Sequence, residues 1–114
     1  MKARFLPAAT FELEAAADYY KEVGSGLGRD FRNEVRRIVT LISNHLRVGH
    51  AVNAGTKTAL RKFDLHRFPY RLIYSIEGGG ILIVAVAHQH RRSSYWRHRI
   101  EEPAPNYMAS RLAA

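Results

Sequence analysis

The sequence predicts an α+β domain in which an N-terminal helical hairpin packs on a small, mainly antiparallel sheet, in the order β-α-α-β-β-β. Apolar residues recur at helical spacing up to about residue 46, and at the strand period of two from residue 59 onward. With 114 residues and a hydrophobic fraction of 46%, the chain is long enough for one domain with a single core. We expect residues 1–99 to form this domain and residues 100–114 to form a tail.

The first half of the predicted domain is the helical hairpin. Lys2–Leu6 is a short strand candidate, and Pro7 and Thr10 mark the start of the first helix, with Thr10 as a possible N-cap. The apolar face of this helix consists of Ala9, Leu13, Ala16, Ala17, Tyr20 and Val23. A glycine-rich run at residues 24–28 ends it. The apolar stripe of the second helix consists of Leu27, Phe31, Val35, Ile38, Ile42 and either His45 or Leu46. Two amphipathic helices joined by a short break predict an αα-hairpin.

The second half of the predicted domain is the sheet. After a loop at residues 47–57, three stretches have the character of strands: Ala59–Leu65, Tyr70–Glu77 and Ile81–His88. Gly78–Gly80 is a hairpin connector between the last two. The third strand is apolar on both faces, so we expect it to be central and covered by the helices. Ser93–Arg99 is a candidate for a short helix.

The composition excludes several classes of protein. No apolar run approaches the roughly 18 residues of a membrane span, and the N-terminus lacks the apolar stretch of a secretory signal. The chain contains no cysteine, which excludes a disulfide framework and thiolate chemistry. We therefore expect a cytoplasmic protein that does not associate with membranes.

The positive charge is concentrated in one segment. The chain has a formal net charge of +8, and residues 57–99 alone contain nine basic and two acidic residues, a net charge of +7. Such a concentration indicates either an acidic or polyanionic partner or a solvated basic face. Charge alone favours these two interpretations about equally.

Histidines follow the third predicted strand, in a chain that lacks phosphate-loop, nucleophile-elbow and paired-cysteine motifs. His88 and His90 have a spacing that can bind a metal, but no cysteine or carboxylate nearby completes the shell, and Arg91 and Arg92 oppose a cation. We expect no metal and no cofactor. The histidines are candidates for acid–base chemistry or phosphate contact. In the structural alternative, His88 ends the central strand by hydrogen bonding.

Basic residues on the predicted sheet form a candidate binding face. Those along the first two strands are Arg61, Lys62, Arg67 and Arg71. Together with Arg91 and Arg92 they predict a basic concavity. Guanidinium groups match phosphate geometry, and Tyr95 or Trp96 could stack on a base. The alternative is a solvated face whose aromatic residues fill the edge of the core, and this is the favoured interpretation for Trp96.

Three stretches together resemble a known family. Arg67–Tyr74 (RFPYRLIY), Ile83–His88 (IVAVAH) and the Tyr95-Trp96-Arg97 run after Arg91 resemble the RelE/ParE superfamily of toxins from bacterial type II toxin–antitoxin systems. The likeness covers about residues 1–99 and points to the ParE-like, plasmid-stabilisation branch. It implies a small sheet packed by a helical hairpin, and a tight complex with an antitoxin that wraps the toxin.

The superfamily holds two activities, which this resemblance leaves open. RelE-like members cleave mRNA in the ribosome without a metal, using basic residues of the sheet and a C-terminal tyrosine. ParE-like members inhibit DNA gyrase. Of the RelE-type residues, three have matches here, namely Lys62, Arg71 and Tyr95. Asp64 stands where a further lysine is expected, and Gln89 stands where an arginine is expected.

We predict a toxin that is neutralised by a cognate antitoxin and interferes with DNA gyrase. The alternative is a ribosome-dependent mRNA endonuclease, whose catalytic residues would be Arg71, His88, His90, Arg91 and Tyr95. Residues that would bind nucleic acid or a protein partner are Arg61, Lys62, Arg67, Arg92 and Trp96. A third possibility is a basic module without toxicity. The antitoxin is expected to be acidic or amphipathic, lying on the basic sheet or on the apolar groove beside the hairpin.

Overall fold

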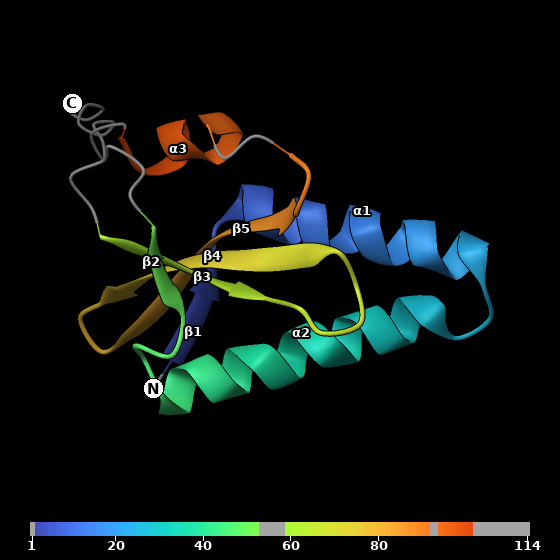
Figure 1. Cartoon of the computed structure of the whole chain (residues 1–114), viewed down its shortest axis with the longest axis horizontal. Helices are drawn as coiled ribbons and strands as arrows, with labels where there is room; N and C mark the ends of the chain where they lie inside the picture. The colour runs from blue at the N-terminus through green and yellow to red at the C-terminus, as the bar shows by residue number, and fades with distance from the viewer. Residues whose placement is uncertain (1, 53–58, 92–93, 102–114) are drawn as a thin grey trace.

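The computed structural model describes residues 2–52, 59–91 and 94–101, and in this part of the chain five strands form one sheet accompanied by three helices (Figure 1). The elements are β1 (Lys2–Phe5), α1 (Pro7–Val23), α2 (Leu27–Asn44), β2 (His50–Val52), β3 (Leu60–Asp64), β4 (Tyr70–Glu77), β5 (Gly80–His88) and α3 (Ser94–Glu101). The sheet order is β1-β5-β4-β3-β2, with β1 parallel to β5 and all other neighbours antiparallel. The predicted α+β class, with a helical hairpin on a mainly antiparallel sheet, is confirmed.

Helix α1 begins earlier than the sequence predicted. Leu6 is the N-cap in an extended conformation and Pro7 occupies the first turn, where its fixed φ is already helical. The prediction of Thr10 as the cap was therefore wrong, because its N–H already donates an intrahelical bond to Leu6 O at 3.0 Å. The prediction that Val23 belongs to the apolar face in the core was also wrong. It is 55% exposed, because the end of α1 extends past the sheet (Figure 1).

Helix α2 packs closely on α1. A Cβ at Gly28 would lie 2.6 Å from Ala17 O, so glycine permits this approach. The predicted stripe is confirmed at its centre, where the buried residues are Phe31, Val35, Ile38 and Ile42. The helix ends at Asn44 and His45 is exposed, so Leu46 is the residue that packs against the core.

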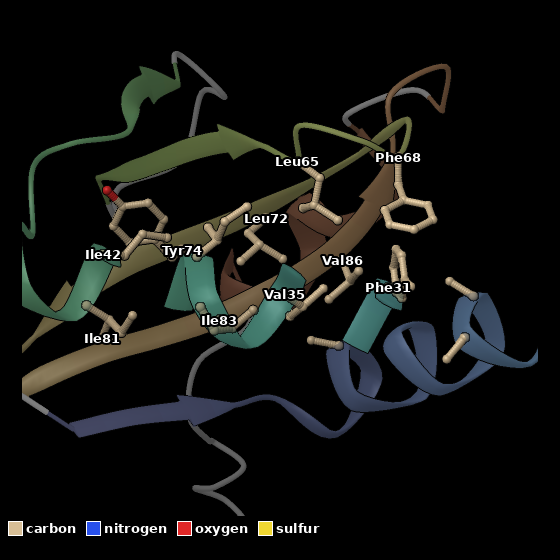
Figure 2. Packing of buried hydrophobic residues seen from close by; sticks show 14 residues of the cluster. Phe31, Val35, Ile42, Leu65, Phe68, Leu72, Tyr74, Ile81, Ile83 and Val86 are labelled. Atoms are coloured by element: carbon tan, nitrogen blue, oxygen red, sulfur yellow. The ribbon is translucent and has the colours of Figure 1, made fainter. Parts of the chain in front are cut away.

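The sheet has an apolar core on each face. Residues of the helical hairpin pack on one face against side chains of β4 and β5 such as Leu72, Ile83 and Val86 (Figure 2). On the other face Trp96 of α3 packs against Ile73 and neighbouring residues. Helix α3 and the hairpin thus cover opposite sides of the sheet (Figure 1).

Strand β5 is buried on both faces, as predicted, but it contains a bulge. In its pairing with β4, Ile73 lies opposite Ala85 and Tyr74 lies opposite Ile83, so Val84 is an extra residue. Before the bulge Ile83 faces the hairpin, and after it Val86 does. The strand lies inside the sheet, between β4 and β1, which agrees with the expected central position, although β4 is the middle strand of the five.

Two further differences concern chain connections. The predicted loop at residues 47–57 contains the edge strand β2, three residues that pair with β3 and are too few to show alternation. Helix α3 continues to Glu101, so the predicted tail overlaps it by two residues. Residues 53–57 of the predicted loop, Ser93 at the start of the predicted helix, and the rest of the tail lie outside the described residues.

Candidate functional site

A pocket of about 180 Å³ opens on the face of the sheet that carries α3. Its lining, which defines the sheet pocket, consists of Val52, Lys62, Arg71, Ile73, Ala87, His88, Arg91 and Trp96. Cross-strand neighbours share a face of a sheet. Lys62 of β3 lies opposite Ile73 of β4, and Arg71 of β4 lies opposite Ala87 of β5. The small alanine next to long basic side chains leaves the hollow.

Arg71 is held in place by an ion pair. Its Nε lies 3.0 Å from Asp64 Oδ1, on the neighbouring strand. Asp64 is the residue that replaces the lysine expected from the RelE pattern. It places an anion beside the pocket and neutralises part of the charge of Arg71.

The ring of His88 turns away from Arg71. It packs edge-on against Tyr70, with ring centroids 5.1 Å apart, and Tyr70 packs against the hairpin-face core. Successive residues of a strand point to opposite faces, so Tyr70 and Arg71 lie on opposite sides of β4. His88 therefore contributes to the rim of the pocket while its imidazole lies on the other side of the sheet.

A hydrogen bond from the backbone of His90 to the side chain of His88 joins the two histidines. His90 N–H donates to His88 Nδ1 at 3.1 Å, and the two rings are 5.2 Å apart. Since Nδ1 accepts, the neutral His88 ring carries its proton on Nε2. The N–H of Arg91 also donates to His88 O at 3.0 Å, which closes the turn after β5. Hydrogen bonds thus end this strand at His88.

Gln89 stands where the RelE pattern expects an arginine. Its backbone N–H donates to Pro69 O at 2.8 Å, and its side-chain amide donates to Tyr70 O at 3.4 Å. The residue fastens the end of β5 to the start of β4, a structural role that leaves the pocket without the expected cation.

Tyr95 lies under two guanidinium groups. The Cζ atoms of Arg91 and Arg99 are 4.0 and 5.2 Å from its ring centroid. Burial, together with the hydrogen bond to Glu12 and the negative charge of that carboxylate, raises the pKa of Tyr95 far above its usual range. The nearby arginines oppose this shift without cancelling it. The hydroxyl therefore keeps its proton at neutral pH.

Glu12 and Arg99 form an ion pair that we call the edge clasp. Strand β1 pairs only with the first part of β5. Along the rest of β5, this edge has no neighbouring strand among the described residues, and the edge clasp binds the β5 backbone there. Val86 N–H donates to Glu12 at 3.0 Å, and Arg99 donates to Val84 O at 3.0 Å. The two side chains are also joined by bonds of 2.8 and 2.9 Å.

The edge clasp changes the titration of its members. Burial disfavours the Glu12 carboxylate, but hydrogen bonds from Arg99, the Val86 amide and Tyr95 outweigh it and lower the pKa of Glu12. The Glu12 carboxylate raises the pKa of Arg99 in turn. Sequence reasoning missed this pair, because its partners are 87 residues apart and no local pattern links them.

Of the remaining predicted site residues, Arg61 and Arg67 lie elsewhere. Arg61 donates to the carbonyl oxygens of Arg47 and Gly49, at 3.2 and 2.6 Å, and so fixes the loop before β2. Arg67 lies 3.7 Å from Asp30 of α2. Neither lines the pocket. Trp96 is 2% exposed and forms a wall, and Arg92 lies outside the described residues.

Glu34 is a buried carboxylate that sequence reasoning also missed. It is 4% exposed on α2 and accepts hydrogen bonds from the backbone N–H groups of His66 and Arg67. It thereby holds the turn between β3 and β4. The burial of Glu34 could have been predicted, because position 34 lies three residues after Phe31 and therefore on the inward side of the helix.

A second hollow runs along the outer side of the hairpin. Two adjoining cavities of about 420 and 300 Å³ share Arg32 and Arg36, and together they define the hairpin groove. Its apolar floor includes Leu13 and Val35. Arg32 reaches across to Glu14 of α1 at 2.6 Å, and this contact raises the pKa of Arg32.

The described residues contain no cluster of three or more side chains suited to hold a metal ion. No helix in the same part of the chain is long and apolar enough to cross a bilayer. The sheet pocket is lined mainly by basic and apolar side chains, a combination suited to binding an anion.

Comparison with known proteins gives two findings. The family model described as "ParE toxin of type II toxin-antitoxin system, parDE" matches residues 3–93. A chain from the solved structure "Chromosomal ParDE TA system from P. aeruginosa" is similar in fold, with a TM-score of 0.65 and 18% sequence identity over 77% of this chain and 95% of that chain. No curated protein matches the sequence.

Proposed function

From the premise that the chain belongs to the ParE toxin family of type II toxin–antitoxin systems, we propose that it arrests growth in the cytoplasm by binding DNA gyrase. A cognate antitoxin neutralises it. This mode of action needs a shaped binding surface and no bond-breaking machinery in the toxin itself.

The bulge at Val84 is the observation that carries the proposal. It places the His88 ring on the Tyr70 side of the sheet, opposite the side that bears Arg71. RNA cleavage needs a base, an acid and a cation around one phosphate. Here the imidazole and the guanidinium that would share these roles are separated by the sheet.

Tyr95 supports the same conclusion. In the nuclease interpretation this hydroxyl would exchange a proton with the RNA. Its raised pKa makes it a poor proton donor, and phenolate is not populated at neutral pH. The pKa of this hydroxyl is raised by burial and by Glu12, which belongs to the edge clasp.

The clustering of Lys62, Arg71 and Arg91 around one pocket favours mRNA cleavage as a second candidate. Three cations in one hollow suit a phosphate. In that case Arg71 and Arg91 stabilise the charge of the scissile phosphate, while His88 or His90 transfers the proton in the ribosome.

Gyrase supercoiling assays and mapping of mRNA ends after induction separate the two candidates. We expect purified protein to inhibit supercoiling, and we expect His88→Ala to retain both this inhibition and toxicity. New mRNA ends at ribosome-bound sites that disappear in both His88→Ala and Arg71→Ala would overturn the proposal in favour of the nuclease. Absence of growth arrest with or without the antitoxin would instead indicate a basic module without toxicity.

Neutralisation by an antitoxin is supported by two basic surfaces, the sheet pocket and the hairpin groove. An acidic, amphipathic segment complements both their charge and their apolar parts. Co-expression of the adjacent gene should restore growth, and the two proteins should purify as a complex. Growth arrest that persists with every neighbouring gene expressed would contradict this part of the proposal.

A further inference from the structure

We infer that the sheet pocket is a receptor for one acidic side chain of a protein partner, an aspartate or glutamate carboxylate presented by an acidic peptide. The inference rests on the proposed function, in which the partners are proteins, and it identifies the group that the pocket recognises.

The net positive charge of the pocket attracts an acidic side chain. Lys62, Arg71 and Arg91 supply three positive charges, and Asp64 beside Arg71 offsets one of them. Asp64 lies 3.0 Å from Nε of Arg71 without completing a hydrogen bond, so the guanidinium has no hydrogen-bond partner among the described residues. Lys62 likewise has no ion pair in this part of the chain. An incoming carboxylate would satisfy both groups.

The size of the pocket favours a single side chain over a whole small molecule. Sites for small molecules and cofactors usually enclose about 300–1,000 Å³, whereas this pocket encloses about 180 Å³. It has room for a side chain and too little for a nucleotide. Its apolar walls, which include Val52, Ile73 and Trp96, would contact the methylene groups of the side chain.

The aromatic residues near the pocket argue against single-stranded nucleic acid. Binding of that kind depends on exposed rings on which bases stack. Trp96 is 2% exposed and belongs to the core under α3. The Tyr95 ring already has the Arg91 guanidinium over it at 4.0 Å. Neither residue offers a free stacking surface.

Trp96 allows a direct test, because it is the only tryptophan of the chain and lines the pocket. The full chain is titrated with a capped pentapeptide of three glutamates between two leucines, and tryptophan emission is followed. The same peptide with glutamines and a single-stranded RNA dodecamer are the comparison probes. We expect saturable binding of the glutamate peptide that weakens with salt, and no binding of the glutamine peptide.

Two variants locate the binding. Lys62→Met keeps the apolar stem and should weaken the glutamate peptide about tenfold or more. Asp64→Asn removes an exposed anion and should tighten binding severalfold. Arg4→Ala, on the surface of β1, is the control and should leave the affinity unchanged.

The outcomes are distinguishable from those of the gyrase assay. Equal binding of the glutamate and glutamine peptides, or affinities unaffected by both pocket variants, would overturn the inference. The inference would also be overturned if the RNA bound in a way that depends on Lys62 while the glutamate peptide did not bind. If the chain binds the peptide but leaves gyrase active, the inference stands and the proposed target is rejected. If the chain inhibits gyrase but does not bind the peptide, the proposed target stands and the inference is rejected.

Discussion

Replacement of Arg99 by methionine should destabilise the protein strongly, because it removes one half of the edge clasp. In the folded chain Arg99 donates two hydrogen bonds to Glu12 and one to Val84 O. The side chains of Arg99 and Glu12 are only 12% and 17% exposed. Methionine keeps the apolar stem, so the change isolates the loss of the guanidinium.

The magnitude follows from what remains after the change. Removing one member of a buried ion pair costs about 3–5 kcal/mol, because the other charge stays buried without a partner. Both side chains here retain some contact with water, and Glu12 keeps its bond from Val86 N–H. We therefore expect a loss of about 2–4 kcal/mol in the free energy of unfolding.

Urea unfolding followed by far-UV circular dichroism and by Trp96 fluorescence measures the effect. Arg4→Met is the matched control, because its ion pair with Glu77 is exposed and 3.6 Å long, and it should change stability by less than about 0.5 kcal/mol. Adding Glu12→Gln completes a double-mutant cycle, in which we expect a coupling of at least about 1 kcal/mol. An Arg99→Met protein as stable as the Arg4→Met control would refute the reasoning.

Three further changes test other parts of the structure. Urea unfolding should show that the Glu12→Gln variant loses less stability than the parent between about pH 5 and pH 2. The pKa of Glu12 is lower in the folded chain than in the unfolded chain, so the ionised carboxylate stabilises the fold fully above the unfolded pKa. This stabilisation is lost as the pH falls through the folded pKa. Gly28→Ala should cost about 1–3 kcal/mol in the same assay, since its Cβ would meet a backbone oxygen at 2.6 Å, whereas Gly79→Ala meets nothing within 4 Å and should be nearly neutral. Glu34→Ala should cost about 1–3 kcal/mol and leave two turn amides without acceptors, and unchanged thermal unfolding would contradict this.

The helical hairpin and the longer strands could be predicted because burial follows a short period in the sequence. Phe31 and Ile42 are buried as the helical spacing requires, and β4 has the predicted bounds of Tyr70–Glu77. Val23 fits the same spacing and is exposed. The period of apolar residues predicts which residues share a face of the helix, but it does not predict where the sheet that covers this face ends.

The pairing of β1 with β5 could not be predicted from local pattern. The two strands are separated by the whole hairpin, and their parallel register brings Gly80 so close to Lys2 that a Cβ at Gly80 would lie 2.0 Å from Lys2 O. The short β2 carries too little pattern to detect. Contacts between distant segments decide both features.

The net charge of residues 57–99 overstated the surface available to a partner. Arg61 is bound to backbone carbonyls, Arg67 lies beside Asp30, and Arg99 belongs to the edge clasp. The guanidinium groups of Arg61 and Arg99 hold two segments of the chain together. Counting charges in a sequence cannot separate such residues from those that face solvent in a pocket.

The placement of the candidate site depends on one extra residue. Without the bulge at Val84, strict alternation along β5 would put Ala87 on the hairpin side with Ile83, and His88 on the side of Arg71. With it, Ala87 faces α3 and opens the pocket, while the His88 ring turns to Tyr70. Pattern reading along a strand assumes a constant period, so it gathers the histidine and the arginines into one site. The bulge separates them and leaves a basic hollow that can hold a carboxylate.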